Sequence, residues 1–268
     1  MRGYNASRVG KRCGVGARPR RPLSADGLLL LISCLRGKRL TPDAGSIRII
    51  HMMNINHQIR KAPVSQLIRW WTGEEVPQWA STTSLLHDKV ASELSRRGSK
   101  GVQFLKTQAG CGDIRKRSTV LCALARKGSY DSEVENLFNE AFYNEARLEP
   151  EVALAFQGLA LDCFIRVRQF PLGRSAVEPL LELENRYVSA SAMVYLSHKF
   201  QEEAIKILKE GLKSSNPIKR GYACTEAAFR NMSELRSEVE SLLRDEDVFV
   251  ARSAQIARDV FIHNNERA

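Results

Sequence analysis

Hydrophobic residues recur at helical spacing through most of the chain. Leu86, Val90 and Leu94 lie on one face of a helix that the pattern predicts over 84–97. Residues 201–212 contain five apolar residues that form one continuous stripe of an amphipathic helix. Valine, isoleucine and threonine nowhere alternate cleanly with polar residues, so no strand is predicted. The pattern therefore predicts an all-α protein.

The predicted helices come in pairs from Gly101 onward. First helices are expected over Gly101–Gln108, Ser132–Tyr143, Ser175–Leu183, Gln201–Leu212 and Ser233–Leu243. Second helices are expected to begin near Ile114, Val152, Val188, Ile218 and Val250, at separations of 38, 36, 30 and 32 residues. A repeat of this length is typical of a helical solenoid, in which each unit stacks on its neighbours. Unrelated amphipathic helices in a bundle are the alternative.

Capping chemistry marks where several helices should begin. Asn216-Pro217 and Glu149-Pro150 place proline at a first helical position, where its missing N–H is no loss. Capping-box spacing occurs in three pairs, Thr72 and Glu75, Ser132 and Glu135, and Ser175 and Glu178. Small residues recur in the second helices, and small side chains allow adjacent helices to approach closely. They are Ala190, Ala192, Ala223, Ala227, Ala228, Ala251, Ala254 and Ala257.

Three of the second-helix starts share a sequence pattern. They are Asp247-Val248-Phe249-Val250-Ala251-Arg252-Ser253-Ala254, Asn216-Pro217-Ile218-Lys219-Arg220 and Asp113-Ile114-Arg115. This pattern resembles the inter-helix motif of HEAT repeats, and the resemblance covers about residues 101–268. The starts at Val152 and Val188 lack the basic residue. The resemblance implies a right-handed α-α superhelix of about five helix pairs, and it says little about function.

A tryptophan-rich segment, residues 52–100, precedes the repeats. A short helix is predicted over Ser65–Trp71, followed by a turn at Gly73. All three tryptophans lie in this segment: Trp70, Trp71 and Trp79. They either cover the end of the repeat core or anchor a binding partner. The predicted organisation is a basic segment over 1–51, an N-terminal helical cap over 52–100 and HEAT-like repeats over 101–268.

Residues 1–51 differ in composition from the rest of the chain. They hold seven of the 17 glycines and a formal net charge of +9, whereas residues 52–268 carry only +2. Their one apolar run, Leu28 to Leu35, is far too short to cross a bilayer. The segment is expected to be disordered. It is a targeting sequence, a functional basic tail, or translated upstream DNA preceding a start at Met52 or Met53.

The composition and motifs limit the chemistry that can be predicted. The chain is 43% hydrophobic and 26% charged, which is ordinary for a globular protein and excludes a multi-span membrane protein. No P-loop, dinucleotide-binding, zinc-protease or nucleophile-elbow motif occurs, and no metal site or cofactor is predicted. The six cysteines include no C-x-x-C pair, which favours reduced, buried thiols in the cytoplasm. An enzyme or lyase-type chaperone would direct attention to Cys111 and His87.

Basic residues gather at the starts of the second helices: Arg115, Lys116, Arg117, Lys219, Arg220 and Arg252. In HEAT-like solenoids these helices line the concave face, so stacking would align the bases in a ladder. Either they bind an acidic protein partner, or each pairs with an acid of a neighbouring unit. With Trp70 and Trp71 they are the predicted partner-binding residues of a non-enzymatic scaffold protein. Nucleic-acid binding is the alternative function, and the small charge of residues 52–268 weighs against it.

Overall fold

The computed structural model describes residues 55–77, 80, 83–110, 113–126, 128–143 and 148–265. Within these residues the regular structure is helical and includes no strand, which confirms the predicted all-α class. The predictions for residues 1–51, Trp79 and Cys111 fall outside the described residues.

The helices follow one another through the described chain. Residues 55–61 are helical. The helices that follow are α3 (Val64–Thr72), α4 (Thr83–Leu94), α5 (Ser99–Gln108), α6 (Ile114–Leu124), α7 (Ser132–Tyr143), α8 (Pro150–Val167), α9 (Arg174–Val177), η2 (Glu178–Glu182), α10 (Arg186–Lys199), η3 (Gln201–Glu203), α11 (Ala204–Leu212), α12 (Pro217–Phe229), η4 (Ser233–Leu235), α13 (Arg236–Ser241), η5 (Leu242–Arg244) and α14 (Val248–Asn265). All five predicted second-helix starts fall within two residues of an observed helix start.

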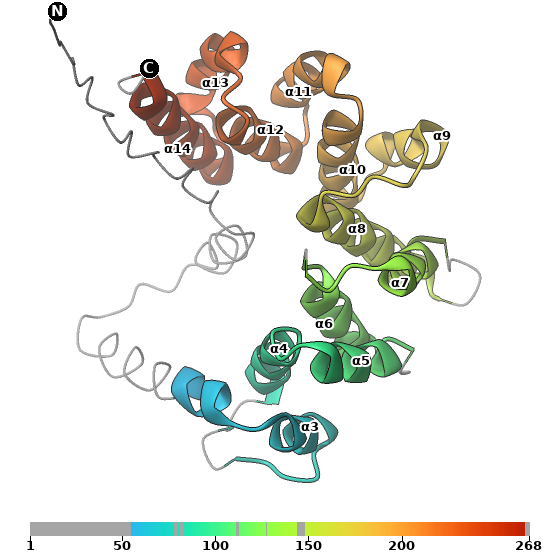
Figure 1. Cartoon of the computed structure of the whole chain (residues 1–268). Helices are drawn as coiled ribbons and strands as arrows, with labels where there is room; N and C mark the ends of the chain where they lie inside the picture. Colours follow the sequence, from blue (N-terminus) through green and yellow to red (C-terminus); the bar gives the residue numbers. More distant parts are fainter. Residues whose placement is uncertain are drawn as a thin grey trace, which may run out of the picture. The chain divides into compact units, whose positions relative to one another are not determined.

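Helices pack mainly against helices that are near them in the chain. The second helices α6, α8, α10, α12 and α14 contact one another in that order. Each of α5, α7, α11 and α13 packs against the second helix that follows it, and Figure 1 shows these pairs in sequence. Neighbour-to-neighbour packing means that each unit must bury its apolar face against the next one.

The buried side chains form two hydrophobic clusters that meet at α10. Tyr195 and Leu196 of α10 belong to the cluster that extends back to Ile59, whereas Met193 and Val194 belong to the cluster that extends forward to Phe261. α10 is buried on nearly all sides, which is the pattern expected of a helix enclosed by neighbours. The core is therefore continuous along the described helices, with α10 contributing to both parts.

Three predicted first helices are interrupted by 3-10 turns. The prediction over Ser175–Leu183 is observed as α9 followed by η2, and the one over Gln201–Leu212 as η3 followed by α11. The prediction over Ser233–Leu243 is observed as η4, α13 and η5. In η2 the cause is local, because Pro179 has no N–H to donate to an α-helical acceptor. Such tight turns are common at helix ends.

Side-chain caps fix the starts of four of the five second helices, whereas α8, which follows Glu149, has none. Asn216 accepts from the backbone N–H groups of Ile218 and Lys219, with Pro217 at the first helical position as predicted. Asp113, Asn185 and Asp247 cap α6, α10 and α14 in the same way. Each such cap contributes about 1 kcal/mol. The caps therefore define the helix starts that the repeat pattern predicts.

The three predicted capping boxes are wrong. Thr72 ends α3 rather than beginning a helix, because Gly73 follows in the left-handed conformation with φ 84°. Asp131 precedes Ser132 and accepts the hydrogen bond from the Val134 N–H, at 3.0 Å. At the third predicted box, Ser175 and Glu178, α9 begins at Arg174 with no side-chain cap.

Glycine permits close packing between α12 and α14 at Gly221, where a Cβ atom would lie 2.2 Å from the Phe249 ring.

Candidate binding surface on the second helices

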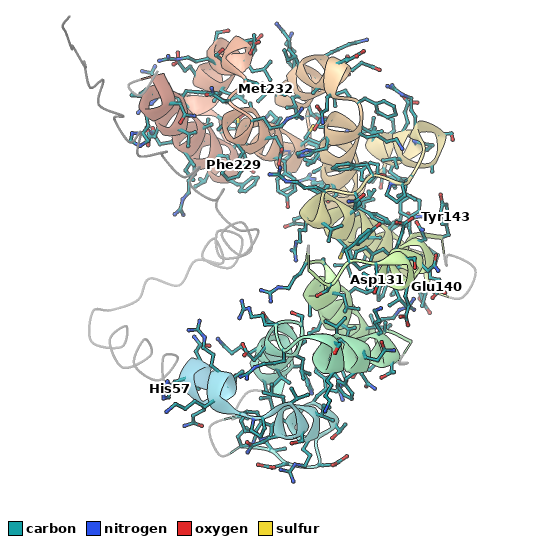
Figure 2. The ribbon with its side chains drawn as sticks, in the orientation of Figure 1. His57, Asp131, Glu140, Tyr143, Phe229 and Met232 are labelled. Carbon is teal, nitrogen blue, oxygen red and sulfur yellow. The ribbon has the colours of Figure 1, made fainter. Side chains whose placement is uncertain are left out.

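The exposed side chains of α6, α8, α10, α12 and α14 form the surface that we call the second-helix face. Figure 2 shows Phe229 and Met232 on opposite sides of α12. Met232 packs against the second core cluster, whereas Phe229 is 47% exposed on the second-helix face. The predicted basic residues lie near the starts of three of these helices, α6, α12 and α14.

Three of the predicted basic residues occupy the first turn of α6. The Asp113 carboxylate accepts hydrogen bonds from the N–H groups of Lys116 (3.1 Å) and Arg115 (2.9 Å), and these bonds lower the pKa of Asp113. The cap holds the backbone of the first turn of α6. It therefore fixes the positions from which the side chains of Arg115, Lys116 and Arg117 extend.

Aromatic rings hold two of the three cations in place. The Lys116 Nζ lies 5.9 Å from the centroid of the Trp71 ring, and the Arg117 guanidinium lies 5.1 Å from that of Phe156. A ring attracts a cation through its quadrupole and does not neutralise it. Within the described residues, none of the three forms an ion pair, and the buried Arg117 Nε has no hydrogen-bond partner. Arg115 is exposed. The positive charge of this turn remains available to a ligand.

His87 lies beneath this turn of α6 and does not form an acid–base pair with Asp88. Its ring meets Trp71 edge-on at 5.1 Å between centroids. Burial lowers the pKa of His87, and the charge of Lys116 lowers it further. Asp88 instead accepts a hydrogen bond from the Thr119 hydroxyl at 2.8 Å. His87 is consequently a neutral packing residue near pH 7.

The bases at the start of α12 have partners within the chain. Arg220 forms two hydrogen bonds to the Asp245 carboxylate, at 2.9 and 2.8 Å, and the two side chains are 12% and 8% exposed. The Lys219 ammonium donates to the Leu181 carbonyl, and burial lowers the pKa of Lys219. Arg252 of α14 is exposed. Arg220 thus follows the pairing interpretation, whereas Lys219 is held by a backbone carbonyl rather than by an acid.

The structure does not bring all six bases together. α8 and α10 lie between α6 and α12 in the order of contacts, and the first turn of α8 carries Glu151 after Glu149. Both glutamates are exposed. The expected basic ladder is therefore interrupted by acidic residues.

Trp70 and Trp71 are part of the core. They are 5% and 1% exposed, and their indole N–H groups donate to Glu75 and Gln108, each at 3.2 Å. The hydrogen bond from Trp70 is the main cause of the lowered pKa of Glu75. A partner anchor needs exposed ring surface, which neither tryptophan provides. Their burial fits the interpretation in which the tryptophans cover the end of the repeat core.

Charge is divided unevenly along the helical chain. Residues 55–127, which we call the basic region, contain 13 lysines and arginines against five acidic residues, a formal net charge of +8. Residues 128–268, the acidic region, contain 17 against 23, a formal net charge of −6. The small overall charge of residues 52–268 conceals this division. This division of charge is visible in the sequence when the charged residues of the two regions are counted separately.

Polar side chains that the sequence did not single out meet on the middle second helices. Burial raises the pKa of Asp162 in α8, which is hydrogen-bonded to Ser191 of α10. A hydrogen bond from the Cys163 thiol lowers the pKa of Cys122 in α6, with a smaller effect from the charge of Arg166. Only stacking brings these residues together, so no spacing in the sequence marks them. A polarised thiol and a carboxyl group therefore lie on neighbouring helices.

Other classes of site are not found in the part of the chain that the structure describes. None of its helices combines the length and the hydrophobicity needed to cross a membrane. No group of three or more histidine, cysteine, aspartate or glutamate side chains there could hold a metal ion. No protein-family model matches the sequence, and no curated protein matches it.

Proposed function

We propose that this protein is a non-enzymatic binding protein, built as a HEAT-like solenoid, that binds an acidic protein partner through the second-helix face at α6. Two features support the solenoid. The second helices begin at separations of 36, 36, 31 and 31 residues, close to the predicted ones, and they contact one another in chain order. A solenoid leaves an extended surface on one set of helices, and such surfaces bind proteins.

The unpaired cations of α6 carry this proposal. Arg115, Lys116 and Arg117 are held by a cap and two aromatic rings, and no ion pair within the described residues neutralises them. Preorganised charges lose little side-chain entropy on binding. They also lie in the region with the +8 excess, which would steer an acidic partner toward them.

Nucleic-acid binding is a second candidate, and the charge of the basic region favours it. A duplex backbone presents phosphates continuously, so it needs a track of cations. The exposed Glu149 and Glu151 interrupt that track directly after α6 in the stack. A local acidic patch on a protein fits three clustered cations better.

Charge reversal at α6 tests the proposal. The full chain and its Arg115→Glu, Lys116→Glu double variant would be used as baits in a cell extract, with captured proteins quantified by mass spectrometry. The most depleted protein would then be purified and its affinity measured at low and high salt. We expect a loss of about tenfold or more at low salt, which shrinks as salt screens the charges.

A control with the same change of charge separates charge from site. The Lys206→Glu, Lys213→Glu double variant reverses two exposed lysines, one in α11 and one at its C-cap. It leaves α6 intact, so it should retain the partner. Circular dichroism must show that both variants remain helical. Equal loss in both variants would contradict a site at α6. A labelled duplex that binds more tightly than the captured protein, with a steep salt dependence, would support the nucleic-acid candidate instead.

A further inference from the structure

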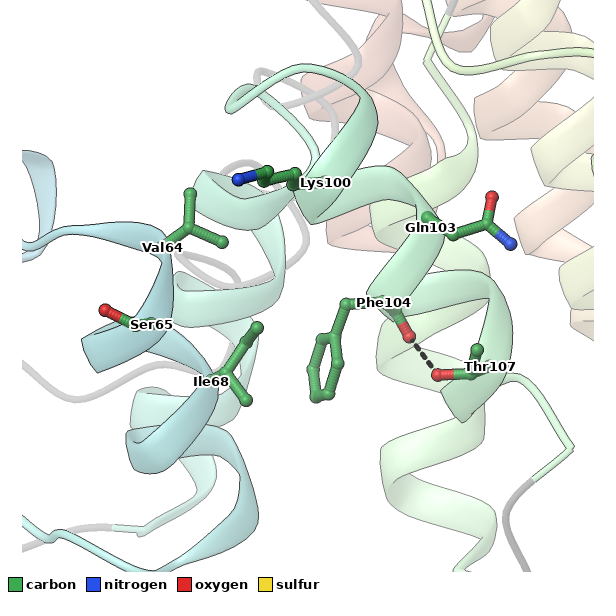
Figure 3. A pocket seen from close by; sticks show the side chains of 7 residues that line it. All are labelled: Val64, Ser65, Ile68, Lys100, Gln103, Phe104 and Thr107. Atoms are coloured by element: carbon green, nitrogen blue, oxygen red, sulfur yellow. Dashed lines mark hydrogen bonds between the residues drawn. The ribbon is translucent and has the colours of Figure 1, made fainter.

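An open apolar groove lies between α3 and α5. It has a volume of about 750 Å³ and is lined by Val64, Ser65 and Ile68 of α3 and by Lys100, Gln103, Phe104 and Thr107 of α5. Figure 3 shows Ile68 and Phe104 facing each other across its middle. The α5 residues are spaced 3, 4 and 7 positions from Lys100, so one face of that helix lines the groove. Grooves of this form accept an amphipathic helix.

One end of the groove is basic. Figure 3 shows Lys100 beside Val64 at that end, and none of the lining residues is acidic. Within the described residues Lys100 has no carboxylate partner, and Lys61 is exposed three positions before Val64. An acidic segment would find the Lys100 ammonium at this end, with Lys61 close by in the chain.

Both groove helices begin at this basic end, and neither start has a side-chain cap. The residue before α3 is Pro63 and the residue before α5 is Gly98, and neither provides a side-chain acceptor. The starts of α6, α10 and α12 do have one, whereas those of α8, α11 and α13 do not. The first N–H groups of α3 and α5, and the positive ends of their dipoles, therefore add to the attraction for a carboxylate.

We propose that the α3–α5 groove binds an amphipathic helix of a partner protein, with its apolar side chains on Ile68 and Phe104 and its acidic end at Lys100. The negative end of a helix dipole is its C-terminus, so the bound helix runs antiparallel to α3 and α5. This surface uses none of the α6 cations. It is thus a second recognition site, independent of the one proposed above.

Peptide selection on the full chain tests this site. A display library of peptides of about 15 residues, long enough for a helix, would be selected against immobilised protein. Selected sequences should carry apolar residues at helical spacing and acidic residues toward the C-terminus. Affinity of the winning peptide would then be measured by fluorescence anisotropy. Phe104→Ser should weaken it about tenfold or more, as loss of an anchor contact does.

Two charge variants keep the test decisive even where Phe104→Ser disturbs folding. Lys100→Glu changes an exposed residue and should weaken the peptide at low salt and much less at high salt. The Lys213→Glu variant makes the same change of charge at an exposed lysine outside the groove lining, and it should bind the peptide as the wild type does. No selected binder, or winners without acidic residues that ignore Lys100→Glu, would overturn the proposal. A winner with its acidic residues toward the N-terminus would overturn the antiparallel direction.

Discussion

The basic residues at the starts of α6 and α12 are held differently. At α12 the Arg220 guanidinium is bound by the Asp245 carboxylate at 2.8 Å. At α6 the Lys116 and Arg117 side chains instead lie against aromatic rings. A carboxylate both positions and neutralises a cation, whereas a ring only positions it. Net charge by itself would not reveal which cations can bind a partner.

The ion pair of α12 should be the most sensitive to mutation. Asp245→Ala leaves the nearly buried Arg220 guanidinium without its carboxylate, and breaking such a pair costs about 3 kcal/mol. Arg115→Ala removes an exposed, unpaired cation and should change the free energy of unfolding by less than about 0.5 kcal/mol. Urea denaturation of both variants measures the difference. Similar losses would show that the starts of α6 and α12 do not differ as described.

Acid should weaken the acidic region through particular carboxylates. Hydrogen bonds from Lys209 and Ser237 lower the pKa of Glu238 to about 2, and the Arg220 guanidinium lowers the pKa of Asp245. A carboxyl group with a lowered folded-state pKa stabilises the fold above its unfolded pKa, and this stabilisation is lost as the pH falls through the folded value. Unfolding measured between about pH 5 and 2 should lose stability steeply.

The Glu238→Gln, Asp245→Asn double variant should lose stability less steeply over the same pH range. It removes two of the carboxyl groups whose pKa is lowered in the folded state, while Glu75, Asp113 and Asp131 keep theirs. An unchanged slope would assign the acid sensitivity to other carboxylates.

Removing helix caps should have equal effects on stability and unequal effects on binding. Asp113→Ala and Asn216→Ala each remove a side chain that accepts two backbone N–H groups, at a cost of about 1 kcal/mol. Asp113→Ala also removes a negative charge beside the α6 cations, so it should tighten binding of an acidic partner at low salt. Denaturation and affinity measurements on the two variants check this. Weaker binding in the Asp113 variant would mean that cap geometry outweighs charge.

The smallest effect concerns the thiols. The pKa of Cys122 is lowered by the Cys163 thiol, whereas burial raises the pKa of Cys224 to about 12. Thiolate is the reactive form, so Cys122 should be alkylated before Cys224 at about pH 8 in the folded protein. Peptide mapping after brief iodoacetamide treatment reads each cysteine separately. Equal labelling in 6 M urea would serve as the control, and faster reaction of Cys224 in the folded state would contradict the assignment.

Local features of the sequence predicted the helix starts well. Asp113, Asn216 and Asp247 are caps that act within three residues, so their effect does not depend on distant packing. The capping boxes failed where a competing partner was also close, as with Asp131 before Ser132. Glu135, predicted to complete that box, instead accepts from the Tyr130 hydroxyl. Spacing alone does not decide between two nearby acceptors.

The candidate site was only partly predictable. The sequence identified Arg115, Lys116 and Arg117 as a cluster at a helix start, and the structure places them on one turn of α6. It left both binding and internal pairing open for Lys219 and Arg220, which lie 25 and more residues from their partners. The groove residues Ile68 and Phe104 had no signal, because each alone resembles an ordinary half-buried helix position.

The sequence by itself determined the helical class, the paired helices and the places where second helices begin. Periodicity and capping act over one or two helical turns, so they can be recognised in the sequence before the tertiary structure is known. Only the tertiary structure decided that Trp71 is buried, that Arg220 is paired and that Lys116 lies over a ring. Those outcomes depend on which helices stack together, because a side chain finds its partner tens of residues away only after its helix has packed.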